Sequence, residues 1–284
     1  MMRSKLSSST EITSGKDAAY ENFPVGSILI SSELRPHIHT FYYFARVIDD
    51  IADSPDLTAD EKLRRLEGFE DAILGVNKSD PDFISGHRMH KSLNQTKVDK
   101  KHCIDLITAF KQDTFKNRYA DWDELLNYCM LSAAPVGRYL LDLHGESQGA
   151  YPSSDALCSA LQVLNHVQDC RDDFQTLNRI YLPVSFFEDE EILCHTLEKA
   201  DLTDAFEYSL KAIINNSIKL INQSRLLPKK LNSTRLRIET NIIITVADHL
   251  SKKLLKENPF TRRIRLSKLQ YFWCCVSGIF RNTI

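Results

Sequence analysis

The feature of this sequence that most constrains its fold is the spacing of apolar residues, which recur every three and four positions along almost the whole chain. That spacing places them on one face of an α-helix, which makes one turn in about 3.6 residues. Only nine glycines and nine prolines interrupt the 284 residues, and most of them lie between the apolar segments. Strand patterns are almost absent. We therefore predict an all-α protein, with helices at about 32–53, 59–75, 99–115, 122–144, 153–177, 203–226, 233–256 and 262–281.

The chain is expected to form a single domain. It contains no internal repeat, long linker or low-complexity stretch, and its length can bury a sizeable core. Residues 1–17 are expected to be a disordered polar leader, and residues 18–284 to form the domain. Pro135 lies inside the predicted helix 122–144, where its ring and its missing amide hydrogen predict a kink or a break.

Composition excludes some functions and indicates a compartment. Lys plus Arg number 36 and Asp plus Glu 38, so the net charge of −2 is unlike that of a nucleic-acid-binding protein. Seven cysteines without a C-x-x-C pair indicate reduced thiols, and the polar leader has no apolar signal segment, so we expect a cytoplasmic protein. The apolar run from Leu269 to Phe280 is too short to cross a bilayer. A packed last helix is the favoured interpretation, and a peripheral membrane contact stays open.

The first acidic cluster lies within the predicted helix 32–53. Asp49 and Asp53 are four residues apart, so their carboxylates share one helix face at about 6 Å. Arg46 and Tyr42 extend the same stripe, and the surrounding residues are apolar, so the stripe is expected to point inward. Two inward carboxylates repel each other unless a cation joins them. Oxygen ligands of this kind suit Mg²⁺, which usually shares its coordination shell with water and substrate phosphates.

The second acidic cluster repeats this arrangement in the predicted helix 153–177. Asp169 and Asp173 are again four apart, Asn165 precedes Asp169 by four, and Gln162 precedes Asn165 by three. One D-x-x-x-D pattern alone is more often a solvated helix face. Two of them, each beside polar residues suited to phosphate, predict a cavity where a cluster of Mg²⁺ ions binds a diphosphate. Arg46 would add a bidentate phosphate contact.

Other catalytic sites lack their signatures. The chain has no H-E-x-x-H or E-x-x-H pattern, and His166 alone is more often a satisfied core residue than a metal ligand. Neither G-x-x-x-x-G-K-[ST] nor G-x-G-x-x-G occurs, so NADPH is not expected as a cofactor.

The paired motifs resemble those of the squalene/phytoene synthase family. They read Y-x-x-x-R-x-x-D-D-x-x-D from Tyr42 and Q-x-x-N-x-x-x-D-x-x-x-D from Gln162. Residues 128–137 and 178–183 continue the similarity, which covers about residues 20–260. The resemblance implies the all-α isoprenoid synthase fold with a central cavity, a prenyl diphosphate substrate and a Mg²⁺ cluster bound with that diphosphate.

Within the family, residues 21–27, 44–53, 132–138 and 166–173 resemble the branch that makes hydroxysqualene in bacterial hopanoid pathways. That branch converts presqualene diphosphate and water into hydroxysqualene and diphosphate. The resemblance implies metal ligands at Asp49, Asp53, Asp169 and Asp173. It implies diphosphate contacts at Arg46, Gln162, Asn165 and Arg179, and a cation pocket that includes Phe41 and Phe44. Tyr42 and Tyr128 would be catalytic, by positioning water or relaying a proton.

Several alternatives stay open. The chain has Ala134-Pro135 where condensing members usually carry a small glycine-containing pair, and Gln168 and Asp172-Asp173 where they carry R-D-x-x-E-D. Condensation of two farnesyl diphosphates to presqualene diphosphate or squalene, and phytoene synthase-like activity, are therefore disfavoured alternatives. An inactive scaffold or a class I terpene cyclase ranks lower, because all four motif aspartates are present. Exchange of substrate or product with neighbouring pathway enzymes, at the inner face of the membrane, also stays open.

Overall fold

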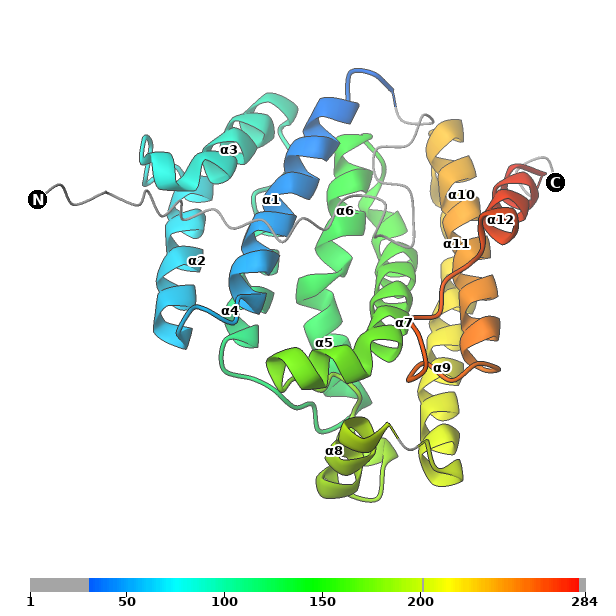
Figure 1. Cartoon of the computed structure of the whole chain (residues 1–284). Helices are drawn as coiled ribbons and strands as arrows, with labels where there is room; N and C mark the ends of the chain where they lie inside the picture. The colour runs from blue at the N-terminus through cyan, green and yellow to red at the C-terminus, as the bar shows by residue number, and fades with distance from the viewer. Residues whose placement is uncertain (1–30, 201, 281–284) are drawn as a thin grey trace, which may run out of the picture.

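The computed structural model describes residues 31–200 and 202–280, and within them the predicted all-α architecture is confirmed (Figure 1). The α-helices are α1 (Arg35–Asp53), α2 (Ala59–Leu74), α3 (Ile84–Thr96), α4 (Lys101–Asp113), α5 (Trp122–Ser132), α6 (Ala134–Leu143), α7 (Tyr151–Leu177), α8 (Glu190–Lys199), α9 (Asp204–Ser224), α10 (Leu227–Lys230), α11 (Thr234–Leu254) and α12 (Lys268–Phe280). Three short 3₁₀ turns lie at Pro81–Phe83, Gln148–Ala150 and Val184–Phe186. Strand structure in this part of the chain is limited to one isolated bridge between Arg118 and Ile180.

The helix boundaries differ from the predicted ones where local sequence is a weak guide. Pro135 breaks its helix as expected: α5 ends at Ser132 and α6 begins at Ala134. The proline lies in the first turn of α6, where backbone N–H groups have no hydrogen-bond acceptor within the helix. The missing N–H of proline therefore removes no helical hydrogen bond. Helices α3, α8 and α10 were not predicted, because α3 carries few apolar residues and α8 and α10 have only ten and four residues. The last helix starts at Lys268 rather than at 262, and the predicted leader 1–17 lies outside the described residues.

Two large hydrophobic cores, and a small third one between α11 and α12, make up the described part of the fold. One is built around α1 with α2, α3 and α4, and its largest fully buried side chains include Phe44 and Phe69. The other surrounds α7, which packs against α5, α6, α9 and α11. Figure 1 shows α1 and α7 on either side of α6, and the two acidic helices belong to different cores.

The end of α7 directs the chain back toward α1. Asn178 caps this helix in the left-handed region with φ 51°, a conformation that asparagine tolerates better than most residues. The turn is followed at once by Arg179, Ile180 and Tyr181, all buried. Ile180 and Tyr181 join the core around α7, while Arg179 reaches back to Asp53 at the end of α1.

Candidate active site

A cavity of about 370 Å³ lies between the two acidic helices. Helices α1, α4, α5, α6, α7 and α11 contribute to its wall, so both hydrophobic cores border it. The structure brings eleven of the predicted site residues to this cavity: Phe41, Tyr42, Arg46, Asp49, Asp53, Tyr128, Gln162, Asn165, Asp169, Asp173 and Arg179. Apolar side chains from α4, α6 and α7 line much of the remaining wall. One cavity therefore combines a charged region with a large apolar surface.

Phe44 is the predicted site residue that the structure places elsewhere. It is fully buried and its ring packs edge-on against Phe69 of α2, with 6.3 Å between ring centroids. The reason is helical geometry. At about 100° per residue, Phe44 projects from the side of α1 opposite to Tyr42, Asp49 and Asp53. Phe41 does face the cavity, where it stacks on Tyr139 with 3.9 Å between centroids.

On α1, Arg46 holds the acidic motif in place. Its Nη1 lies 2.7 Å from Asp49 Oδ2, and its Nη2 lies 2.9 Å from Asp50 Oδ1. Asp50 is buried and does not line the cavity, which agrees with its position off the predicted stripe. The guanidinium therefore orients one carboxylate of the motif while a second, buried carboxylate anchors it.

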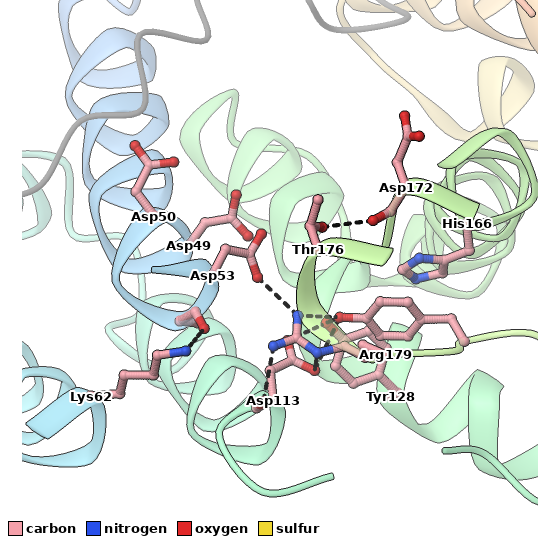
Figure 2. Close-up of polar contacts among 12 residues, drawn as sticks. Asp49, Asp50, Asp53, Lys62, Asp113, Tyr128, His166, Asp172, Thr176 and Arg179 are labelled. Atoms are coloured by element: carbon pink, nitrogen blue, oxygen red, sulfur yellow. Dashed lines mark hydrogen bonds and ion pairs between the residues drawn. The ribbon is translucent and has the colours of Figure 1, made fainter. Parts of the chain in front are cut away.

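On α7, Asp169 is paired with an arginine that sequence reasoning did not select. Arg263 Nη2 lies 3.0 Å from Asp169 Oδ2, and Arg263 lines the cavity from the segment between α11 and α12. Its only signal in the sequence was a cluster of basic residues before the last helix. Asp172, by contrast, is exposed and lies outside the cavity wall, and its side chain points away from Asp49 and Asp53 in Figure 2.

Arg179 connects the two halves of the site (Figure 2). Its Nη1 donates to Asp53 Oδ1 at 2.8 Å and to the Tyr181 hydroxyl at 3.1 Å, and its Nη2 donates to the Asp113 carbonyl at 2.9 Å. The side chain is only 4% exposed. Charged hydrogen bonds of this kind are strong when water is excluded, so Arg179 fixes the end of α1 relative to the end of α7.

Asp113, the last residue of α4, is a second residue that the sequence reading missed. Its two carboxylate oxygens accept hydrogen bonds from the Tyr128 hydroxyl at 2.7 Å and the Tyr181 hydroxyl at 3.1 Å. Burial raises the pKa of Asp113 to about 7, although Arg179 and the two hydroxyls act in the opposite direction. The Tyr128 hydroxyl therefore uses its one proton in the hydrogen bond to Asp113 and stays able to accept hydrogen bonds.

His166 is a buried neutral side chain beside the same cluster. Its ring stacks on Tyr181 with 3.7 Å between centroids, and Gln162 Nε2 lies 3.2 Å from its Nε2. Burial and the nearby Arg179 charge lower the pKa of His166 to about 3. A neutral imidazole accepts the hydrogen bond that the Gln162 amide donates. His166 therefore serves as a packed core residue that also orients Gln162.

Ser132 contributes a hydroxyl to the cavity wall. It is the last residue of α5, one turn after Tyr128, and is 9% exposed. Within residues 31–200 and 202–280, its Oγ has no hydrogen-bond partner. A buried hydroxyl without a partner costs about 1–3 kcal/mol, so a polar group entering the cavity would stabilise it.

The carboxylates fit a metal that arrives with a phosphate ligand rather than one held by protein alone. Among the described residues, no three His, Cys, Asp or Glu side chains gather closely enough to hold a metal ion. Instead the cavity presents two separate pairs, Asp49 with Asp53 and Asp169 with Asp173. Mg²⁺ is commonly bound by one or two carboxylates, with water and substrate phosphates completing its shell. The donor set on each wall matches that pattern.

Comparison with known proteins identifies relatives along nearly the whole chain. A family model described as squalene/phytoene synthase matches residues 17–270. A hydroxysqualene synthase of Rhodopseudomonas palustris is 36% identical over 266 residues, covering 94% of this chain and 90% of the relative. One of Sinorhizobium fredii is 37% identical over 250 residues, covering 88% and 85%. Among solved structures, squalene synthase HpnC from Alicyclobacillus acidocaldarius matches with a TM-score of 0.68 and 26% identity, covering 80% of this chain and 85% of that one.

Proposed function

Because the chain belongs to the squalene/phytoene synthase family and has its isoprenoid synthase helical fold, we propose that it converts presqualene diphosphate and water into hydroxysqualene and diphosphate. The observation that carries this proposal is the single cavity in which two carboxylate pairs and three arginines meet an apolar wall. Such a cavity accommodates a diphosphate at its charged region and a long hydrocarbon beyond it. The names of the relatives at 36% and 37% identity favour hydroxysqualene formation within the family.

The reaction begins with loss of the leaving group. The bond between the substrate carbon and the diphosphate oxygen breaks, and its electron pair leaves with the diphosphate. Mg²⁺, held by Asp49, Asp53, Asp169 and Asp173 together with phosphate oxygens, would supply the positive charge that stabilises this leaving group. The side chains of Arg46, Arg179 and Arg263 line the same region, where guanidinium groups bind phosphate in a bidentate manner. The amides of Gln162 and Asn165 add neutral hydrogen-bond donors.

The carbocation that remains needs an apolar, weakly nucleophilic surrounding. Aromatic faces stabilise a desolvated cation by about 1–2 kcal/mol each. Phe41, Tyr42 and Tyr128 supply such faces on two walls of the cavity. The cation rearranges, a water oxygen forms the new carbon–oxygen bond, and the proton lost from that water passes to the released diphosphate.

The water is best placed near Ser132. Its unsatisfied hydroxyl lies on the cavity wall one helical turn from Tyr128. A hydrogen bond from that hydroxyl would hold a water molecule inside an otherwise apolar region. Replacement Ser132→Ala is expected to keep diphosphate release but to shift the product from hydroxysqualene toward a hydrocarbon formed by proton loss. An unchanged product ratio would remove Ser132 from this role.

The cellular setting is proposed to be the bacterial cytoplasm, at the inner face of the membrane. All seven cysteines are free thiols, as is usual for a reducing compartment. Among the described residues, no helix is long and apolar enough to cross a membrane. The proposed reaction consumes water and no reductant, so NADPH is not required. Neighbouring pathway enzymes would supply the diphosphate substrate and consume the alcohol product.

The first experiment is a product analysis. Purified protein is incubated with presqualene diphosphate and Mg²⁺, without NADPH, and the lipid product is identified by mass. Hydroxysqualene that disappears when EDTA is added is the expected result. Failure with presqualene diphosphate, together with formation of presqualene diphosphate from farnesyl diphosphate, would assign the chain to the condensing branch instead. Asp49→Ala and Asp169→Ala should each abolish turnover without loss of helix content, and near-wild-type activity in either would contradict the metal assignment.

A further inference from the structure

The last helix, α12, carries large apolar side chains on its outer side. Leu269, Phe272, Trp273, Ile279 and Phe280 are between 47% and 67% exposed. Their spacing of three, four and seven or more residues places them within one face of the helix, which we call the outer face of α12. Figure 1 shows α12 at the edge of the molecule, beside α11. Large exposed apolar residues grouped in this way indicate an interaction surface.

The opposite face of α12 packs on the rest of the protein. The outer face is therefore a second apolar face of the helix, in addition to the one that packs. Cys274 and Gly278 are buried against α11, where Cys274 forms a cluster with Ile242 and Val246. A Cβ atom on Gly278 would lie 2.6–2.7 Å from atoms of Ile242, which is closer than packed atoms approach. Helix α12 is therefore seated tightly on α11 in one orientation, and it has more apolar surface than α11 can cover.

The charge around the outer face is positive. Residues 262–280 contain four basic residues and no Asp or Glu, although the whole chain has a net charge of −2. Arg263 is turned into the cavity and Arg262 pairs with Glu257 at 3.3 Å, whereas Arg265 and Lys268 are exposed at the start of the helix. Basic residues beside an aromatic and aliphatic helix face match an anionic lipid surface, where each contributes about 1 kcal/mol of attraction. They oppose pairing of two copies through this face, because like charges would meet.

We propose that the outer face of α12 binds the surface of an anionic phospholipid bilayer. Helix α12 has 13 residues and is about 20 Å long, whereas the bilayer hydrocarbon is about 30 Å thick, so the helix lies in the interface and does not span it. The binding does not depend on the proposed reaction. The position of α12 suggests what membrane binding would achieve. Helix α12 packs on α11, and Thr240 and Ile243 of α11 line the cavity. The membrane surface would thus lie one helix away from the cavity that receives a lipid.

Vesicle binding tests this proposal directly. The full chain is mixed with vesicles of phosphatidylcholine alone or of phosphatidylcholine with phosphatidylglycerol, and the bound fraction is measured by flotation. Binding is expected to the anionic vesicles and to weaken as salt is added. The double variant Phe272→Ser/Trp273→Ser should bind at least about tenfold more weakly, because two aromatic side chains lose their burial in the interface. Phe115→Ser, which removes a 70% exposed aromatic outside α12, is the matched control and should bind like the wild type.

Tryptophan fluorescence gives a second, local readout. The chain has two tryptophans: Trp122 is half-buried against Phe186 at the edge of the core around α7, and Trp273 is 56% exposed on the outer face. The emission should shift to shorter wavelength when anionic vesicles are added. The variant Trp122→Phe should keep this shift, and Trp273→Phe should lose it.

Three results would overturn the proposal. The first is absence of binding to either vesicle, and the second is undiminished binding of the double variant, which would assign binding to another segment such as residues 1–30. The third is sedimentation of the wild type as a dimer and of the double variant as a monomer, which would assign the outer face of α12 to contact with a second copy. Activity on detergent-dispersed presqualene diphosphate separates this proposal from the proposed reaction. The double variant should retain this activity. If the wild type itself lacks the activity, the result would contradict the proposed reaction and not the membrane binding.

Discussion

Arg179 Nη1 lies 2.8 Å from Asp53 Oδ1, so a residue just beyond α7 holds the last carboxylate of α1. Arg263 makes the corresponding contact with Asp169 of α7 from the segment after α11. Each acidic motif is thus paired with an arginine from a distant part of the chain. Arg179 joins the α1 wall of the cavity to the segment after α7, and both arginines offset the negative charge of the carboxylates that they contact. We expect a bound diphosphate to compete with these carboxylates for the two guanidinium groups.

The buried position of Arg179 makes it important for stability. Replacing it by Met should lower the free energy of unfolding by about 3–5 kcal/mol, because Asp113 would remain buried without its neighbouring cation. Urea denaturation measures this change. Arg64→Met is the control: Arg64 pairs with Glu61 on the surface of α2, and such exposed pairs contribute little to stability because water screens them. Equal losses for the two variants would contradict the central role of Arg179.

Two adjacent aspartates of α7 provide a matched test of the cavity. Asp173 lines it and Asp172 is exposed outside it. Asp173→Asn should lower kcat/KM with presqualene diphosphate by on the order of a hundredfold, because charge that stabilises the leaving diphosphate is lost. Asp172→Asn, the same chemical change one residue away, should leave kcat/KM near the wild-type value. Similar losses in both variants would mean that the whole acidic segment, and not its inward face, supports turnover.

His166 should make the protein sensitive to acid. Its pKa in the folded state is lowered from 6.5 to about 3, so between these values the unfolded chain binds a proton that the folded one does not. The stability contributed by neutral His166 is present above pH 6.5 and decreases as the pH falls toward 3. Chemical denaturation of wild type and His166→Asn across this range measures the contribution. The variant should lose less stability on acidification, and parallel curves would refute the prediction.

Asp113 should act in the opposite direction. Its pKa in the folded state is raised from 3.8 to about 7, so between these values the folded protein binds a proton that the unfolded chain does not. Its contribution to stability is therefore greatest below pH 3.8 and decreases as the pH rises through 7. Asp113→Asn cannot ionise, so its stability relative to the wild type should rise between pH 4 and pH 8. Denaturation at the two pH values gives this difference, and a constant difference would show that Asp113 does not titrate in this range.

The local parts of the site were predictable because they depend on helical periodicity. Asp49 with Asp53, and Asp169 with Asp173, share a face whenever their segments are helical, and apolar neighbours indicate that this face points inward. The break at Pro135 follows from proline's own stereochemistry. Phe44 marks the limit of such reasoning: it lies in the motif by sequence, yet the turn of the helix directs it into the core beside Phe69.

The sequence by itself determined most of the helices, the two acidic faces and the family, because each depends on residues a few positions apart or on similarity along the chain. Only the tertiary structure decided which charges meet. Asp53 and Arg179 are separated by 126 residues, and Asp113 reaches the tyrosines of two other segments. No periodicity encodes such contacts, because they arise when separate helices pack and each buried charge must find a partner. The same packing left the outer face of α12 exposed, since α11 covers only one side of that helix.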